Sequence, residues 1–197
     1  MSMSKLYSVG QFVCRVYLRL FFRPKIIGKE NIPDNKGVLL CSNHINNLDP
    51  PFLGAFLKRQ TRYMAKAELF ELPVLKQLLP KLGAFPIKRG SSDRQAMRSG
   101  LKLLRDGEVV GVFPEGTRSK NGKLGKGLAG VGFFALRSDA DVIPCAIVGS
   151  YKPLSKILLV YGPPVDMEKL RKEKASPEAA TEEIMSSIQK LLDKYQK

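Results

Sequence analysis

Apolar and polar residues follow each other in blocks whose spacing predicts strands alternating with helices. The clearest strand signal is Gly37 to Ser42 (GVLLCS), a continuous apolar run typical of a strand buried on both faces. Longer segments with apolar residues three or four positions apart predict helices. Strands are expected at 25–27, 37–42, 62–65, 84–87, 108–113, 142–148 and 157–160. Helices are expected at 53–57, 74–82, 93–105, 128–136 and from 176 onwards.

This alternation predicts an α/β fold with a mixed, largely parallel sheet flanked by helices. Ligands in such sheets tend to bind beyond the carboxyl ends of the strands. The residues that follow three of the predicted strands therefore draw attention: Asn43-His44, Lys88-Arg89 and Pro114-Glu115.

The most apolar stretch is 6–22 (LYSVGQFVCRVYLRLFF), which Arg15 and Arg19 interrupt. A transmembrane helix needs about 20 apolar residues and tolerates a mid-span arginine poorly, and no signal-peptide cleavage site follows. One interpretation is an amphipathic helix in a membrane interface, with both arginines towards water. The other is a helix packed on the protein's own core. The aromatic residues and the lack of acids favour the first, with a membrane-interface helix at 1–22 and an α/β domain at 23–197. The apolar residues at helical spacing are Leu6, Val9, Val13, Val16, Tyr17 and Leu20.

The composition is that of a globular domain with a strong positive charge. The 197 residues are 44% hydrophobic and 26% charged, which excludes a disordered chain. The net charge of +15 indicates an anionic partner: nucleic acid, a membrane surface or a phosphorylated substrate. No dense Lys/Arg run is present, and the aromatic residues are not interleaved with basic ones, so nucleic acid is not favoured. A non-catalytic basic module that binds membrane or nucleic acid remains the alternative from another class.

The three cysteines are expected to be free thiols in a reducing, cytosolic environment. Cys14, Cys41 and Cys145 are odd in number and far apart, and the last two lie in apolar runs. A single histidine and no cysteine cluster argue against a structural zinc site, and no metal or cofactor is expected.

The only histidine, His44, follows the predicted strand 37–42 almost directly. A lone histidine there is more often a surface turn residue, but Asp49 stands five positions on, just before two prolines. A tight turn can bring its carboxylate to the imidazole Nδ1–H, which leaves Nε2 as a base. No G-x-S-x-G motif supplies a nucleophile. A His–Asp dyad alone suits the activation of a substrate hydroxyl.

A candidate phosphate site follows the predicted strand 108–113. Gly116 lets main-chain N–H groups approach an anion, Thr117 offers a hydroxyl, and Arg118 offers a bidentate fork. Glu115 cannot bind phosphate directly and is expected to orient Arg118 or another basic group. Two further cations, Arg89 and Lys66, are weaker candidates. The alternative is a polar turn with a solvated arginine.

Four ordered segments resemble the conserved blocks of the glycerolipid acyltransferases, with a pattern most similar to the lysophosphatidate acyltransferases. The segments are N-H-x4-D from Asn43 to Asp49, GAFPIKR from Gly83 to Arg89, FPEGTRS from Phe113 to Ser119, and VIPCAI from Val142 to Ile147. The resemblance implies a mixed α/β acyltransferase fold.

The resemblance also implies a reaction. An acyl chain would pass from a thioester, acyl-CoA or acyl-acyl-carrier-protein, to the 2-hydroxyl of 1-acyl-glycerol 3-phosphate, giving phosphatidic acid. His44 and Asp49 would be the catalytic dyad; Glu115, Gly116, Thr117, Arg118 and Arg89, with Lys66 as a further candidate, would hold the phosphate; and 142–147 would line the acyl site. The enzyme would sit peripherally at the cytoplasmic face of an anionic membrane. Another glycerophosphate or lysophospholipid acceptor remains open.

Overall fold

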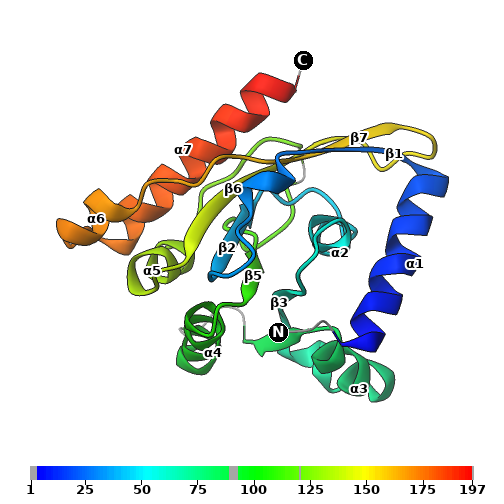
Figure 1. Cartoon of the computed structure of the whole chain (residues 1–197), viewed down its shortest axis with the longest axis horizontal. Helices are drawn as coiled ribbons and strands as arrows, with labels where there is room; N and C mark the ends of the chain where they lie inside the picture. Colours follow the sequence, from blue (N-terminus) through cyan, green and yellow to red (C-terminus); the bar gives the residue numbers. More distant parts are fainter. Residues whose placement is uncertain (1–3, 89–92, 120, 197) are drawn as a thin grey trace.

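Helices cover both faces of a seven-stranded sheet in the computed structural model, which describes residues 4–88, 93–119 and 121–196 (Figure 1). The strands are β1 (Arg23–Ile27), β2 (Val38–Ser42), β3 (Thr61–Lys66), β4 (Ala84–Ile87), β5 (Val109–Val112), β6 (Asp141–Gly149) and β7 (Lys156–Tyr161). The α-helices are α1 (Lys5–Phe21), α2 (Asp49–Ala55), α3 (Pro73–Lys81), α4 (Arg94–Arg105), α5 (Gly130–Arg137), α6 (Glu168–Lys172) and α7 (Pro177–Tyr195). Two 3₁₀ turns are η1 (Lys29–Asn31) and η2 (Ala67–Phe70).

The sheet has the order β1-β7-β6-β2-β5-β3-β4 and is parallel at every pairing except β6 with β7. The predicted mixed, largely parallel α/β fold is therefore confirmed. Strands β2 to β6 all run the same way, so their carboxyl ends meet at one edge of the sheet. Every predicted strand and helix is present, whereas α6 and the two 3₁₀ turns were not predicted.

Helix α2 begins four residues earlier than predicted, at Asp49 rather than at Leu53. Pro50 and Pro51 occupy its first turn, where a missing N–H breaks no helical hydrogen bond. As a result Asp49 stands at the first helical position, at the end of the turn that begins with His44.

Strand β2 separates two hydrophobic clusters, because its side chains alternate between the faces of the sheet. Leu39 and Cys41 face a cluster completed by α4, α5 and α7. Val38 and Leu40 face a second cluster completed by α1 and α2. The expected burial of Cys41 and Cys145 is confirmed; both are free thiols whose pKa burial raises.

Helix α1 meets the body of the protein along one face only. Leu18, together with Phe22 just beyond the helix, is buried in the second cluster. The Gln11 amide donates to the carbonyls of Gly54 (3.0 Å) and Leu57 (2.8 Å), which ties α1 to α2. The interpretation that this helix packs on the protein's own core is therefore correct for one of its faces.

The opposite face of α1 is apolar and open. The stripe expected from the sequence lies there together with two phenylalanines, and Leu20 is 67% exposed. We call this set the α1 apolar face: Leu6, Val9, Phe12, Val13, Val16, Tyr17, Leu20 and Phe21.

The two arginines of α1 do not both face water. Arg15 is half-buried on the side that meets the domain, where its guanidinium donates to Gln11 Oε1 (3.2 Å), so that expectation is wrong. Arg19 is exposed, and its guanidinium carbon lies 5.9 Å from the centroid of the Phe56 ring. Among the described residues, no helix has the length and hydropathy needed to cross a bilayer.

Candidate active site

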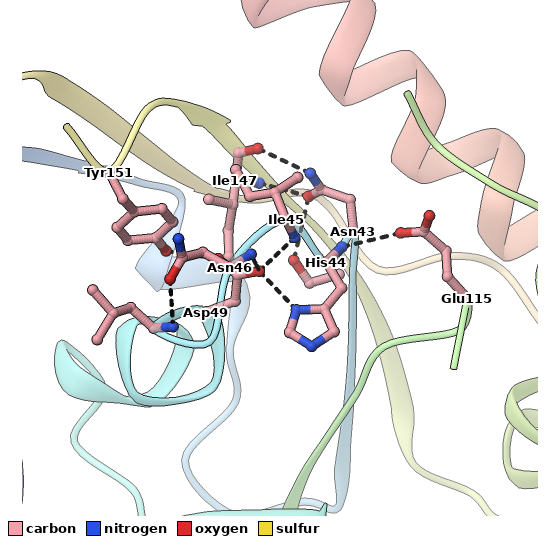
Figure 2. A network of polar contacts seen from close by, with 10 residues as sticks. Asn43, His44, Ile45, Asn46, Asp49, Glu115, Ile147 and Tyr151 are labelled. Carbon is pink, nitrogen blue, oxygen red and sulfur yellow. Dashed lines mark hydrogen bonds and ion pairs between the residues drawn. The ribbon is translucent and has the colours of Figure 1, made fainter. Parts of the chain in front are cut away.

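His44 and Asp49 form a direct pair where β2 ends. The His44 Nδ1 lies 2.7 Å from Asp49 Oδ2 (Figure 2). The Asp49 side chain is 0% exposed and that of His44 is 13% exposed. Since an ionised carboxylate only accepts hydrogen bonds, Nδ1 carries the proton and Nε2 is left as the basic nitrogen. The pairing predicted from the spacing is thus present in the structure.

Two main-chain N–H groups hold the Asp49 carboxylate in place. Ile45 and Asn46 donate to the same oxygen that meets His44, at 2.6 and 2.7 Å. The Asn46 side chain in turn accepts from the Leu48 N–H at 3.0 Å. The five-residue spacing therefore produces a tight turn that wraps around its own carboxylate.

The start of this turn is anchored to the neighbouring strand β6. The Asn43 carboxamide donates to the Ile147 carbonyl (2.9 Å) and accepts from its N–H (2.8 Å), as the upper part of Figure 2 shows. The His44 ring stacks on Phe113, with centroids 4.1 Å apart and planes 23° apart. Stacking and the Asp49 contact together leave the imidazole little rotational freedom.

Glu115 does not orient Arg118, which corrects the expectation from the sequence. One oxygen of its buried carboxylate accepts the His44 N–H at 3.0 Å, and the other accepts the Gly125 N–H at 2.8 Å. Its acidic side chain therefore joins the turn of the dyad to the loop 114–127. These contacts do not indicate that Glu115 binds phosphate directly.

The other candidates for phosphate binding lie on the same edge of the sheet. The Ser119 N–H donates to the His44 carbonyl (2.7 Å), so Arg118 is the immediate neighbour of a residue bonded to the dyad turn. Thr117 and Arg118 are exposed, and the guanidinium forms no ion pair within the described residues. The Gly116 N–H is already used, since it donates to the Phe113 carbonyl (2.9 Å) in a turn with φ of +67°.

Of the two remaining cations, the structure describes only Lys66, and it does not bring Lys66 together with the dyad. Lys66 is exposed at the end of β3, and β5 lies between β3 and β2. No contact joins Lys66 to the pair among the described residues. Arg89 lies outside the described residues. Their part in phosphate binding stays a prediction.

Sequence reasoning missed one residue that touches the dyad, Tyr151. Its hydroxyl donates to Asp49 Oδ1 at 2.7 Å, from the loop that follows β6 (Figure 2). The strand-end rule that selected His44 would also have selected this segment, because β6 is parallel to β2 and ends at the same edge.

The arrangement can remove a proton from a hydroxyl group. It has a base, Nε2, held in one orientation, a buried carboxylate that stabilises the imidazolium, and an exposed arginine on the adjoining loop. It has no serine or cysteine nucleophile bonded to His44 within the described part of the chain. These features suit direct attack by a substrate hydroxyl.

Comparisons with known proteins agree with this chemistry. A sequence profile of the family described as Acyltransferase matches residues 23–148. A 1-acyl-sn-glycerol-3-phosphate acyltransferase of Bacillus subtilis is 35% identical over 158 residues, which cover 77% of this chain and 78% of the relative. The chloroplastic 1-acyl-sn-glycerol-3-phosphate acyltransferase LPAT1 of Arabidopsis thaliana is 31% identical over 135 residues, 67% of this chain and 38% of the relative.

The fold is also similar to that of a solved structure. The 1-acyl-sn-glycerophosphate (LPA) acyltransferase PlsC of Thermotoga maritima superposes with a TM-score of 0.75 at 25% sequence identity. The alignment covers 98% of this chain and 81% of that one.

Proposed function

The chain belongs to the Acyltransferase family, and we propose that it transfers an acyl chain from a thioester to the 2-hydroxyl of 1-acyl-glycerol 3-phosphate, giving phosphatidic acid. The observation that carries the proposal is the buried His44–Asp49 pair, with Nε2 available, at the carboxyl edge of a parallel sheet. The relatives from Bacillus subtilis and Thermotoga maritima are named as acyltransferases that act on 1-acyl-sn-glycerol 3-phosphate, which supports the choice of acceptor.

The reaction is a single displacement. His44 Nε2 takes the proton of the acceptor hydroxyl, and Asp49 stabilises the imidazolium that forms. The oxygen attacks the thioester carbonyl of acyl-CoA or acyl-acyl-carrier-protein, and the thiolate leaves. The proton on Nε2 then passes to the thiolate, which restores the neutral imidazole. No acyl-enzyme forms, because the attacking group belongs to the substrate.

Arg118 binds the acceptor phosphate in this proposal, with Thr117 beside it and Arg89 and Lys66 as further cations. A guanidinium grips two phosphate oxygens at once, so the acceptor is fixed in orientation as well as in position. The hydrogen bond from Ser119 to the His44 carbonyl ties the loop that carries Arg118 to the dyad. Fixing the phosphate therefore places the 2-hydroxyl relative to the base.

The α1 apolar face meets the bilayer in which acceptor and product reside. Eight exposed apolar side chains on one helix are unusual for a surface that faces water. Exposed Lys5, Arg19, Arg23 and Lys25 lie within or next to the same helix and would attract anionic headgroups. The free, buried thiols of Cys41 and Cys145 suit a reducing compartment, and so the cytoplasmic face of the membrane.

Thiol release by the purified protein tests the proposal. Acyl-CoA and acyl-acyl-carrier-protein are each offered with 1-acyl-glycerol 3-phosphate, glycerol 3-phosphate and 1-acyl-glycerophosphocholine. The highest kcat/KM is expected with 1-acyl-glycerol 3-phosphate, because it carries both the dianionic phosphate and an acyl chain. Equal kcat/KM for the zwitterionic acceptor would contradict the role of Arg118, and the absence of thiol release with every pair would contradict the function.

A further inference from the structure

Tyr151 is held against the dyad by two aromatic contacts. It lies in the short loop between β6 and β7, and its ring makes edge-to-face contacts with Phe22 (5.5 Å between centroids) and with Phe52 (6.3 Å). Phe22 directly follows α1, and Phe52 belongs to α2. These neighbours fix the ring in the position from which its hydroxyl donates to Asp49; Figure 2 shows the Tyr151 side chain beside the turn of the dyad.

The two oxygens of Asp49 have different partners. Oδ2 accepts from the His44 ring and from two main-chain N–H groups. Oδ1 accepts from the Tyr151 hydroxyl at 2.7 Å, and no other donor reaches it among the described residues. Because the Asp49 side chain is fully buried, water cannot donate a hydrogen bond to Oδ1 in place of Tyr151. Tyr151 therefore supplies the one hydrogen bond that keeps this oxygen on the side away from His44.

The phenol is a donor in this contact and not an acceptor. Burial, and then the negative charge of Asp49, raise the pKa of Tyr151 well above its usual value. The hydroxyl stays protonated across the physiological range, and its hydrogen bond is stronger to an ionised carboxylate than to a neutral carboxyl group. The hydrogen bond thus favours the charged form of Asp49, which is the form that stabilises an imidazolium.

We propose that Tyr151 is a positioning residue for acyl transfer, which holds the ionised Asp49 carboxylate so that Oδ2 stays on His44 Nδ1. The inference rests on the proposed function, since it assigns a role within that reaction. A tyrosine with a purely structural role would contribute packing and one buried hydrogen bond to stability, and its loss would not change the Nδ1–H signal of His44. Tyr161 provides such a case, because its buried hydroxyl donates to the Leu53 carbonyl at 2.7 Å.

The experiment compares Tyr151→Phe with Tyr161→Phe in the full chain. Each variant loses one buried hydroxyl and keeps its ring, so the cost in stability should be similar. Tyr151→Phe is expected to lower kcat about 5- to 30-fold, less than the full strength of a hydrogen bond to a charged group, because Tyr151 acts on His44 only through Asp49. The KM of each substrate should change less than about twofold, since Tyr151 is assigned no contact with either. Tyr161→Phe should leave kcat within about twofold of the wild type.

A second readout does not depend on turnover. His44 is the only histidine, so a spectrum of histidine ring nitrogens and of the Nδ1–H proton shows a single residue. Tyr151→Phe should shift this Nδ1–H signal, because the charge distribution on its acceptor changes, whereas Tyr161→Phe should not. An unshifted signal together with wild-type kcat in Tyr151→Phe would overturn the proposal.

The experiments distinguish a failure of the positioning role of Tyr151 from a failure of the proposed function. Equal losses of kcat in both variants, with an unchanged His44 signal, would overturn the positioning role and indicate general destabilisation. A wild-type protein that releases no thiol with any donor and acceptor would overturn the proposed function. The His44 signal would still test the contact between Tyr151 and the dyad in that case.

Discussion

Replacing Asp49 with asparagine removes one negative charge from the dyad and almost nothing else. The carboxamide oxygen can take the place of Oδ2 and accept the same three hydrogen bonds, from His44 Nδ1 and from the N–H groups of Ile45 and Asn46. The amide nitrogen then faces Tyr151, whose hydroxyl can accept instead of donate. Packing and hydrogen-bond count are preserved, so the variant isolates the charge.

The size of the effect follows from where that charge lies. Asp49 is fully buried and His44 is nearly so, so water screens their interaction poorly. Hydrogen bonds to charged groups contribute about 1.5–3 kcal/mol, which corresponds to about 10- to 150-fold in rate. General-base catalysis as a whole contributes about 100- to 10,000-fold. We expect Asp49→Asn to lower kcat about 100-fold or more, with the KM of both substrates changed less than about threefold.

Thiol release with acyl-CoA and 1-acyl-glycerol 3-phosphate measures the loss, and thermal melting of the same preparation checks the fold. His44→Ala and the double variant His44→Ala/Asp49→Asn complete the comparison. If Asp49 acts only through His44, the double variant should be no slower than His44→Ala.

Two results would refute this reasoning. The expected loss of kcat is at least about 100-fold. A folded Asp49→Asn protein that keeps more than about a tenth of the wild-type kcat would therefore show that the charge of Asp49 does not stabilise a His44 imidazolium during the reaction. A double variant that is far slower than His44→Ala would show that Asp49 acts on the substrate by a separate route.

The remaining predictions concern the base, the phosphate and the membrane. His44→Ala should abolish turnover and leave the melting temperature nearly unchanged; more than a tenth of the wild-type rate would exclude the mechanism. Arg118→Lys should raise the acceptor KM and lower kcat/KM, with the donor KM little changed, because an ammonium cannot grip phosphate bidentately; an equal loss with a phosphate-free acceptor would assign Arg118 another role. The double variant Val9→Ser/Leu20→Ser should sediment less with anionic liposomes at an unchanged melting temperature, since both side chains are exposed; unchanged sedimentation would argue against the α1 apolar face. Deleting 1–22 should instead lower the melting temperature, because part of α1 is buried in the core.

Local pattern was enough to predict the elements of the fold and the central pair of the site. The run GVLLCS reads as a doubly buried strand, and it is one, because apolar side chains on both faces leave no other favourable environment. His44 and Asp49 are only five residues apart, so a single local turn is able to bring them together. The loop that carries Arg118 could be located in the sequence as well, because it follows β5, another strand that is buried throughout.

Contacts between distant segments could not be read from any local pattern. Glu115 meets the His44 N–H across 71 positions, and Tyr151 meets Asp49 across 102. Both contacts depend on the order of the strands, which places β5 and β6 on either side of β2. A glutamate three positions before an arginine suggests an ion pair, yet in the folded chain the Glu115 carboxylate accepts from two main-chain N–H groups instead.

The N-terminal helix shows the same division between local and tertiary information. The apolar residues at three- and four-residue spacing within 6–22 predicted a helix with an apolar stripe, and α1 (Lys5–Phe21) is that helix. It could not determine which side of the helix meets the protein, because both sides offer apolar residues. Tertiary packing decided that Leu18 and Gln11 face the domain, together with Arg15, and that the expected stripe faces outwards. The physical reason is complementarity: on one side of α1, Gln11 donates to the carbonyls of Gly54 and Leu57 and Leu18 packs into the second cluster.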